Sequence, residues 1–286
     1  MQKLEQEVSL STGDIMFYTP YTKIAIFVLV VFCTILVKLR DCECQLVINV
    51  KNQGGDIVQE SITSNITDDS IVLEFQRPEG TLITQFVDFR SEVQVFRVLV
   101  LGEEERGQSQ YQVLCFITQL TKSDFISADA MSKLRQRNPG AVRQPEEDRP
   151  RETLDMDLIV EVDKSSIISP HLPQICEEAK GASYAREGDL RAWANTPHKA
   201  LSRDIVSLTA SVRRTPPPKP VRCNETNTLW QQPCQCRLEV CVGWYPCGLK
   251  YCRGKSGSYR CGIKTCRKCR AFLFHVLQRQ NCLWDE

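Results

Sequence analysis

The stretch IVLEFQRPEGTLITQFVDF, residues 71–89, contains two short apolar runs separated by a turn signal. The runs Ile71 to Phe75 and Leu82 to Phe86 are rich in the branched and aromatic residues that favour strands. Between them, Pro78 suits the first central position of a turn and Gly80 suits its last position. The stretch therefore predicts a β-hairpin.

The sequence around this hairpin continues the same pattern. Further apolar runs are Leu46 to Val50, Ile57 to Ile62, Phe86 to Leu101 and Tyr111 to Leu120. The polar turn signal Gln53 to Asp56 separates the first two runs, and the polar loop Gly102 to Gln108 separates the last two. Residues 45–120 therefore predict an antiparallel sheet with one buried face.

Helices are expected after these strands. Ser127 can cap a helix with Met131 on its apolar face, and Ser169-Pro170 begins another with Cys176 on its buried face. Residues 139–152 are charged and proline-rich, which is typical of a loop. The predicted fold class is α+β: an antiparallel sheet flanked by two or more helices, followed by a small disulfide-rich module.

Changes in composition along the chain predict four parts. They are an N-terminal extension with a signal segment at 1–44, the α+β domain at 45–212, a proline-rich linker at 213–222 and a cysteine-rich domain at 223–286.

The first part contains the apolar run Ile24 to Val37, which as a helix would span about 21 Å of a hydrocarbon core about 30 Å thick. This short length favours a cleaved signal peptide, with translation starting at Met1 or at Met16. A retained signal anchor and a buried core helix are the alternatives. We therefore expect a secreted extracellular protein, or else a type II membrane protein anchored by this segment alone.

Ten of the fifteen cysteines lie in the last part: Cys223, Cys234, Cys236, Cys241, Cys247, Cys252, Cys261, Cys266, Cys269 and Cys282. Exported thiols meet an oxidising compartment, and a segment this short buries too little surface to fold unaided. We therefore expect disulfides, whose pairing the spacing leaves open. The alternative is zinc, since Cys266 and Cys269 have ligand spacing, although the tail offers no second such pair.

The tail is also locally basic, although the net charge of the whole chain is only +1. No acidic residue interrupts the cations Lys250, Arg253, Lys255, Arg260, Lys264, Arg267, Lys268 and Arg270. This stretch predicts either a solvated face or a site for a sulfated glycosaminoglycan. The expected compartment excludes nucleic acid as the partner.

Short sequence motifs give expectations for glycosylation and for catalysis. Asn65 and Asn224 each begin a glycan acceptor sequence. The histidines His171, His198 and His275 stand in unrelated contexts, and the sequence shows neither a nucleophile motif nor a phosphate-binding glycine loop. We therefore expect a protein that is not an enzyme and has no cofactor or metal.

Three segments carry a family resemblance: GQSQYQVLCFITQL from Gly107, MSKLRQRNPGAVRQ from Met131, and QRQNCLWDE at the C-terminus. They closely resemble the Out at first protein family. Within that resemblance, residues 45–212 are similar to a BRICHOS domain, which implies a twisted antiparallel sheet flanked by two helices. Cys241 and Cys269 are additional to the eight tail cysteines that the family implies, and we expect them to pair with each other.

The BRICHOS-like pattern also assigns roles to single residues. It implies a disulfide between Cys115 and Cys176, and it places Asp88 in a strand as a carboxyl that makes the local structure responsive to pH. A strand-end carboxylate facing water is the alternative for Asp88.

The resemblance implies chaperone-like binding of β-prone or hydrophobic segments of another secreted protein. The competing expectation is an extracellular developmental signalling or matrix ligand that acts through the basic tail. In either case the partner is an unidentified extracellular client or receptor.

Overall fold

A computed structural model describes residues 44–52, 54–121, 123–195, 205–215, 221–224, 232–254 and 257–283. Residues 44–286 form one compact unit. The predicted signal segment, Ile24 to Val37, lies outside the described residues. Within the part of the chain that is described, no helix is both long and apolar enough to cross a membrane.

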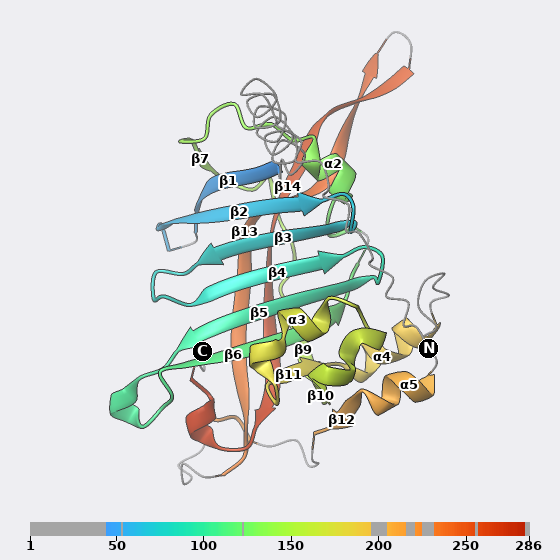
Figure 1. Ribbon diagram of the computed structural model, residues 1–286. Coiled ribbons are helices and arrows are strands. Elements are labelled where there is room, and N and C mark those ends of the chain that lie inside the picture. The colour runs from blue at the N-terminus through green and yellow to red at the C-terminus, as the bar shows by residue number, and fades with distance from the viewer. Residues whose placement is uncertain are drawn as a thin grey trace, which may run out of the picture. The chain divides into compact units, whose positions relative to one another are not determined.

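A ten-stranded sheet forms one layer of this unit (Figure 1). Its strands are β1 (Cys44–Lys51), β2 (Ile57–Asn65), β3 (Ser70–Gln76), β4 (Leu82–Asp88), β5 (Val93–Leu101), β6 (Tyr111–Gln119), β7 (Val142–Arg143), β10 (Leu158–Val160), β11 (Ser183–Ala185) and β12 (Val212–Arg214). Their order is β12-β10-β11-β6-β5-β4-β3-β2-β1-β7. Strands β1 to β6 are an antiparallel meander, so the sheet predicted from residues 45–120 is present.

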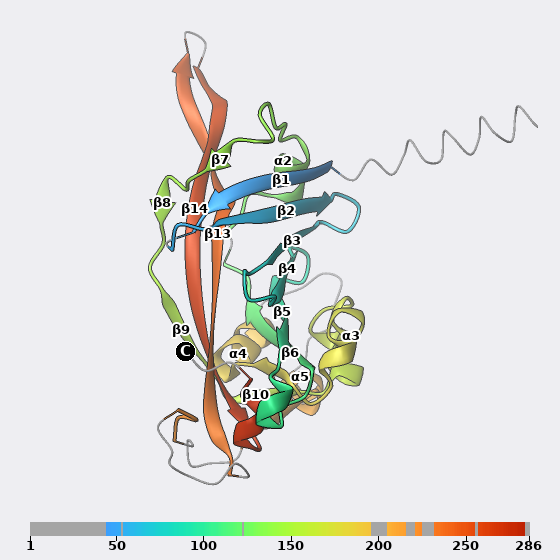
Figure 2. The same ribbon diagram turned by 90° about the vertical axis from the view of Figure 1, so that its left-hand side faces the viewer.

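The C-terminal segment is a second, strongly elongated sheet. Strands β13 (Cys234–Gly254) and β14 (Gly257–Val276) form an antiparallel hairpin, and β8 (Glu147–Asp148) and β9 (Glu152–Met156) pair in parallel with β14. Figure 2 shows this hairpin against one side of the ten-stranded sheet and α3 on the other side. The charged segment predicted as a loop therefore contributes strands to the outer edge of β14.

The helices within the described ranges are few and short. They are α2 (Ala128–Ser132), α3 (Leu172–Ile175), α4 (Glu187–Asn195) and α5 (Ile205–Ala210), with single 3₁₀ turns η1 (Glu104–Arg106), η2 (Val162–Ile167), η3 (Glu177–Ala179) and η4 (Arg279–Asn281). Ser127 caps α2 as predicted, its hydroxyl accepting a hydrogen bond from the amide of Ala130.

The predicted α+β fold, with its BRICHOS-like arrangement of helices around a sheet, is wrong. The structure is mostly β-sheet, with a disulfide-rich C-terminal region. Two physical reasons account for the error. The helix that begins after Pro170 ends within a turn, at the disulfide-bonded Cys176. The tail, expected to be a small separate module, instead forms two strands of 21 and 20 residues. Buried and exposed residues tend to alternate along them, so that one face can pack on the large sheet.

That alternation holds the two sheets together. Phe272 and Phe274 of β14 point toward the ten-stranded sheet, where the ring of Phe272 stacks on Phe116 with 4.3 Å between centroids and lies 5.3 Å from Phe96. Phe274 lies 5.2 Å from Phe116, which completes an aromatic cluster. A continuous hydrophobic core therefore includes residues of both sheets.

A second core lies on the opposite face of the ten-stranded sheet. There Trp193 of α4 and Leu172 of α3 are fully buried against strand residues such as Val95 and Ile117. The apolar side chains of the sheet are thus covered by the hairpin and α2 on one side and by α3, α4 and α5 on the other.

Among the described residues there are six disulfides: Cys115–Cys176, Cys223–Cys234, Cys236–Cys282, Cys241–Cys269, Cys247–Cys266 and Cys252–Cys261. Cys115 of β6 is joined to the end of α3, in the core on the helix side. Four of the others link the two long strands or their immediate flanks. Cys266 and Cys269 are each in a disulfide, so the zinc alternative has no free thiolates at that pair.

Replacing Phe272 by Ala should lower the free energy of unfolding by about 3–5 kcal/mol, because it removes the ring at the centre of the inter-sheet aromatic cluster. Leu277→Ala is the matched control, since that side chain is 69% exposed and its loss should change stability by less than about 0.5 kcal/mol. Chemical denaturation with the disulfides intact measures both. Equal effects of the two substitutions would contradict the packing described here.

Candidate functional site

The outer end of the hairpin extends beyond β1 in both Figure 1 and Figure 2. We call residues 248–254 and 257–263 the arm. Cys252 and Cys261 form a disulfide across it, and the register pairs Tyr251 with Arg260 and Arg253 with Ser258. The arm is therefore a stapled two-stranded ribbon. Its base packs on the core through Leu249 and Ile263, and its outer part has solvent on both faces.

One face of the arm combines aromatic and cationic side chains. Residues two apart on a strand share a face, as do directly opposite residues, so Tyr251, Arg253 and Arg260 lie on the same face. Tyr251 is 60% exposed, and Tyr259 on the other face is 57% exposed. Tyr and Arg are the residue types enriched at the energetic centres of protein interfaces.

The eight cations predicted to bind a polyanion have different environments. Arg253 and Arg260 are exposed on the arm, and Lys255 lies outside the described residues. Lys250, Lys264 and Arg267 form ion pairs with acidic side chains of β8 and the residue before it. Lys268 and Arg270 are buried, so the prediction of polyanion binding rests on the arm and on the paired cations beside it.

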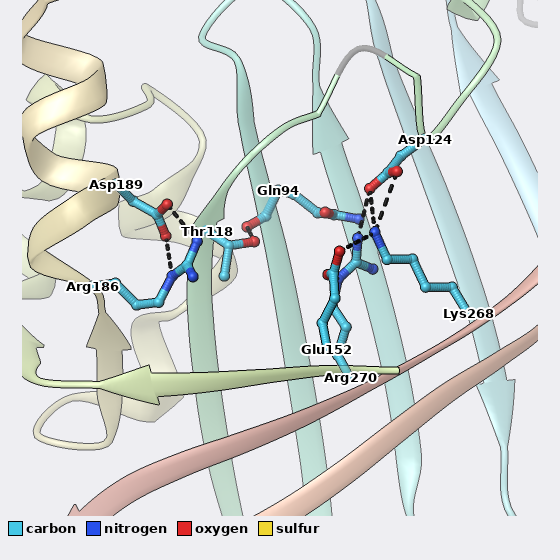
Figure 3. Close-up of polar contacts among 8 residues, drawn as sticks. All are labelled: Gln94, Thr118, Asp124, Glu152, Arg186, Asp189, Lys268 and Arg270. Atoms are coloured by element: carbon cyan, nitrogen blue, oxygen red, sulfur yellow. Dashed lines mark hydrogen bonds and ion pairs between the residues drawn. The ribbon is translucent and has the colours of Figure 1, made fainter. Parts of the chain in front are cut away.

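Lys268 and Arg270 belong to a buried ion network between the two sheets (Figure 3). Asp124 accepts from Lys268 Nζ at 3.1 Å and from Arg270 Nη2 at 2.7 Å. Glu152, at the start of β9, accepts from the same two cations at 2.8 and 3.1 Å. Two carboxylates thus balance two cations, and the Arg270 guanidinium also lies over the ring of Phe96 at 5.2 Å.

The local sequence explains how Asp124 reaches this position. Its amide donates to the carbonyl of Thr121 in a tight turn, and Phe125 packs against Tyr245 with 4.7 Å between ring centroids. The amide of Ile126 then donates to the carbonyl of Pro246. Loop residues after β6 therefore enter the space between the sheets and carry the carboxylate with them.

A polar pocket of about 300 Å³ adjoins the network and is lined by Gln94, Thr118, Glu152, Arg186 and Arg270 among others. Figure 3 shows Gln94 and Thr118 between the ion network and the pair Arg186–Asp189. Arg186 donates to both oxygens of Asp189, at 2.8 and 2.6 Å, and that pair stabilises the start of α4. The charged groups here are paired with one another, which favours a structural role for this pocket.

A second buried carboxyl joins the upper part of the sheet to the hairpin. Glu60 of β2 faces β13 and accepts from the amides of Gly243 and Trp244, at 2.7 and 3.0 Å, where a bulge interrupts the ladder with β14. A Cβ atom at Gly243 would lie 2.9 Å from Glu60 Oε1 and 3.0 Å from Val50, so a larger residue here would displace the Glu60 carboxyl. Burial raises the pKa of Glu60 to about 8, although the two amides and Arg267 oppose this shift.

A cavity of about 440 Å³ opens beside Glu60, and Arg77, Arg267 and the Cys241–Cys269 disulfide are among its lining groups. Glu239 approaches the same disulfide, with 3.5 Å between Oε1 and Cys241 Sγ. The side chains of Glu239, Cys241 and Cys269 lie close enough together to be considered as metal ligands. Both sulfurs are in a disulfide, however, so neither cysteine offers a thiolate.

Asp88 lies at the end of β4 and is buried, so its carboxyl does not face water as one alternative expected. It accepts from the amide of Ser91 at 2.9 Å and from the hydroxyl of Ser169 at 2.7 Å. These bonds fix the turn into β5 and tie it to the segment before α3. The predicted response to pH stays a prediction.

Both predicted glycan acceptors are exposed. Asn65 is the last residue of β2, and its side chain exchanges hydrogen bonds with Asp68 in the following turn. Asn224 follows Cys223, and the remaining residues of its acceptor motif lie outside the described part of the chain. Glycosylation of either asparagine stays a prediction.

Sequence reasoning missed Glu60, Asp124 and Glu152 as elements that connect the sheets. The available signal was the period of two in β14, which puts Lys268 and Arg270 on the same face as Phe272. Two buried cations on an aromatic strand face require carboxylate partners, which are the buried Asp124 and the partly exposed Glu152. The position of these partners in the sequence follows only from the tertiary fold.

The fold and its surfaces define a class of protein: a disulfide-stapled, mostly β protein whose C-terminal hairpin packs on a large sheet and projects an arm beyond it. Family models agree with this division of the sequence. The model described as "Out at first" matches residues 44–193, and the model described as "Out at first, C-terminal" matches residues 222–286. The chain belongs to the Out at first family, so the resemblance found in the sequence is confirmed.

Two curated relatives are each called Out at first protein. The one from Drosophila virilis is 54% identical over 274 residues, which cover 91% of this chain and 88% of the relative. The one from Drosophila melanogaster is 56% identical over 257 residues, which cover 85% of this chain and 52% of the relative. The chain thus spans about half of that longer protein. No solved structure matches the chain.

Replacing Asp124 by Ala should lower the free energy of unfolding by about 3–5 kcal/mol, because it leaves two buried cations with Glu152 as their shared carboxylate. Asp163→Ala removes a carboxylate that is 80% exposed and paired with Lys180, so it should cost only about 0–1 kcal/mol. Chemical denaturation distinguishes the two. A small effect at Asp124 would contradict the network in Figure 3.

The stability of the protein should fall as pH rises from about 4.5 to about 8, through the contribution of Glu60. The folded state keeps the Glu60 proton in this range while the unfolded chain releases it, so unfolding becomes easier by up to about 1.4 kcal/mol per pH unit. Glu60→Gln should remove this contribution. Denaturation at several pH values tests it, with the exposed Glu74→Gln as control. Parallel pH profiles for wild type and Glu60→Gln would refute it.

Proposed function

We propose that this protein is an extracellular, non-enzymatic binding protein that contacts an anionic partner through the arm. Support for an extracellular location comes from the twelve cysteines held in six disulfides, a density typical of oxidising compartments. The observation that carries the contact surface is the exposed face formed by Tyr251, Arg253 and Arg260 on a ribbon that a disulfide makes rigid. A backbone that is already rigid loses little conformational freedom on binding.

The charge of the arm indicates the chemistry of the partner. Every ionisable side chain between Lys250 and Arg270 other than tyrosine and cysteine is cationic. Exposed cations on an extended ribbon attract a linear polyanion by long-range electrostatics, and planar guanidinium groups suit sulfate oxygens. A sulfated glycosaminoglycan, alone or on a receptor, is therefore the partner we propose.

The predicted chaperone-like activity has weaker support. It requires a sheet face or edge that can cover a hydrophobic segment of a client. In the described structure, the apolar residues on the two faces of the large sheet pack against the hairpin and the helices. Chaperone activity therefore stays a prediction, and the ligand-like role through the tail is the one we propose.

A non-enzymatic role fits the same observations. The buried charged groups, such as Asp124 and Arg270, are neutralised by one another and join the two sheets. The backbone of His275 accepts a hydrogen bond from the Tyr184 hydroxyl, and burial lowers the pKa of its imidazole. The pairing of Asp124 with Arg270 supports a structural task for these two groups, and the absence of enzymatic activity stays a prediction.

The experiment compares heparin-column elution of the full chain and of Arg253→Ala/Arg260→Ala. The double variant should elute at lower salt, because two exposed cations that contact the polyanion are lost. Lys133→Ala/Arg191→Ala removes the same charge from exposed positions, 68% and 71% accessible, on the short helices. This control should elute close to the wild type.

Equal shifts in the two double variants would mean that only net charge matters and would contradict a site on the arm. Tyr251→Ala tests the aromatic contribution to binding, because this substitution leaves the net charge unchanged. It should also lower the elution salt if the aromatic ring packs against the bound sugar.

A further inference from the structure

The outer edge of β14 is occupied by an acidic segment of the same chain, residues 146–151, which we call the strap. Within the strap, Glu147 pairs with Cys266 and Asp148 with Arg267 in parallel register. The amide of Glu146 donates to the carbonyl of Thr265 at 3.0 Å, and the amide of Arg149 donates to the carbonyl of Arg267 at 2.8 Å. The strap thus binds as an added strand.

Its three acidic side chains meet three cations of the hairpin. Glu146 lies 2.6 Å from Lys250 Nζ, Glu147 is bonded to Lys264, and Asp148 lies 3.6 Å from Arg267. The hydrogen bond from Lys264 lowers the pKa of the Glu147 carboxyl, which keeps it ionised. The edge of β14 therefore recognises an extended backbone and a row of carboxylates together.

The strap is held less firmly than β9, the strand that follows it, since it pairs with β14 at two positions and β9 pairs at five. Pro145 and Pro150 bracket the paired residues and lack the amide hydrogen that would extend the ladder. The Lys250 and Lys264 side chains are each 46% exposed, so their ion pairs are weakened by solvent and salt.

The chain beyond the strap is anchored independently. Strand β9 pairs with β14 over five positions and buries Leu154 and Met156, while Glu152 enters the buried ion network. On the other side, Val142 and Arg143 pair with β1. Arg151, the last residue of the strap, is ion-paired with Glu239 of β13, whose side chain is 9% exposed. Residues 146–149 of the strap can therefore leave β14 while β7 and β9 stay paired.

We propose that the outer edge of β14, from Lys264 to Arg267, is a docking site for an acidic extended segment of a partner protein, and that the strap is its internal competitor. The partner would add a strand by backbone hydrogen bonds to Thr265 and Arg267 and would place carboxylates on the row of cations. This site is separate from the Tyr251 face of the arm and does not depend on polyanion binding there.

The experiment uses the full chain with a neutralised strap, Glu146→Gln/Glu147→Gln/Asp148→Asn. The probe is a fluorescent, end-capped peptide with the sequence of residues 144–150, QPEEDRP. Fluorescence anisotropy should show about tenfold tighter binding to the variant than to the wild type, because the internal competitor has lost its charges. Binding should weaken as salt rises.

Two controls separate this site from general attraction. The peptide QPKKKRP has the opposite charge at the three acidic positions and should not bind. Adding Lys264→Ala and Arg267→Ala to the strap variant should abolish binding of the acidic peptide. Equal affinities of wild type and strap variant, or equal binding of both peptides, would overturn the proposal, as would dimerisation of the strap variant in place of peptide binding.

Hydrogen exchange in the wild type gives a test that needs no substitution. High salt should accelerate exchange at the amides of Glu146 and Arg149 while the amides of β9 stay protected, because the strap pairs with β14 at two positions and β9 pairs at five. Equal protection of the strap and β9 at all salt concentrations would show that the strap does not lift and would reject its role as a competitor.

Discussion

The structure depends on one constraint: the strand face of β14 that packs on the large sheet carries two cations as well as two phenylalanines. Phe272 and Phe274 bind the sheet through aromatic contacts, and strict alternation then forces Lys268 and Arg270 into the same interface. Buried cations without partners would cost more than the aromatic packing returns. The loop that carries Asp124 and the strand that begins at Glu152 supply the carboxylates, so these distant segments are organised around the hairpin.

The same alternation distributes the cations of the tail among different tasks. Those that face inward join the two sheets, those along the outer edge of β14 hold the strap, and Arg253 and Arg260 on the arm remain exposed. The cations of this one basic sequence segment therefore lie in three different environments. We propose that two binding functions follow from this division: a polyanion at the arm and an acidic strand at the edge that the strap covers.

The sequence predicts much of the fold, and the reasons for its failures are physical. The meander from residue 45 to 120 is predictable because its apolar runs and turn signals are local, and the cap at Ser127 is local too. The helix after Pro170 looks longer in the sequence than it is, because its apolar spacing continues past Cys176 while the backbone turns there. The partners of Lys268 and Arg270 are out of reach of sequence patterns, since Asp124 lies more than a hundred residues away.

The central claim is that the disulfide-stapled hairpin and the large sheet are one cooperative structure. Hydrogen exchange of the intact chain, followed by mass spectrometry in increasing guanidinium, tests this most directly. The account predicts that peptides from β5 and β6 and peptides from residues 234–246 and 266–276 lose protection together, because Phe116 and Phe272 belong to one core. Loss of protection in the hairpin at a clearly different denaturant concentration from the sheet would contradict it.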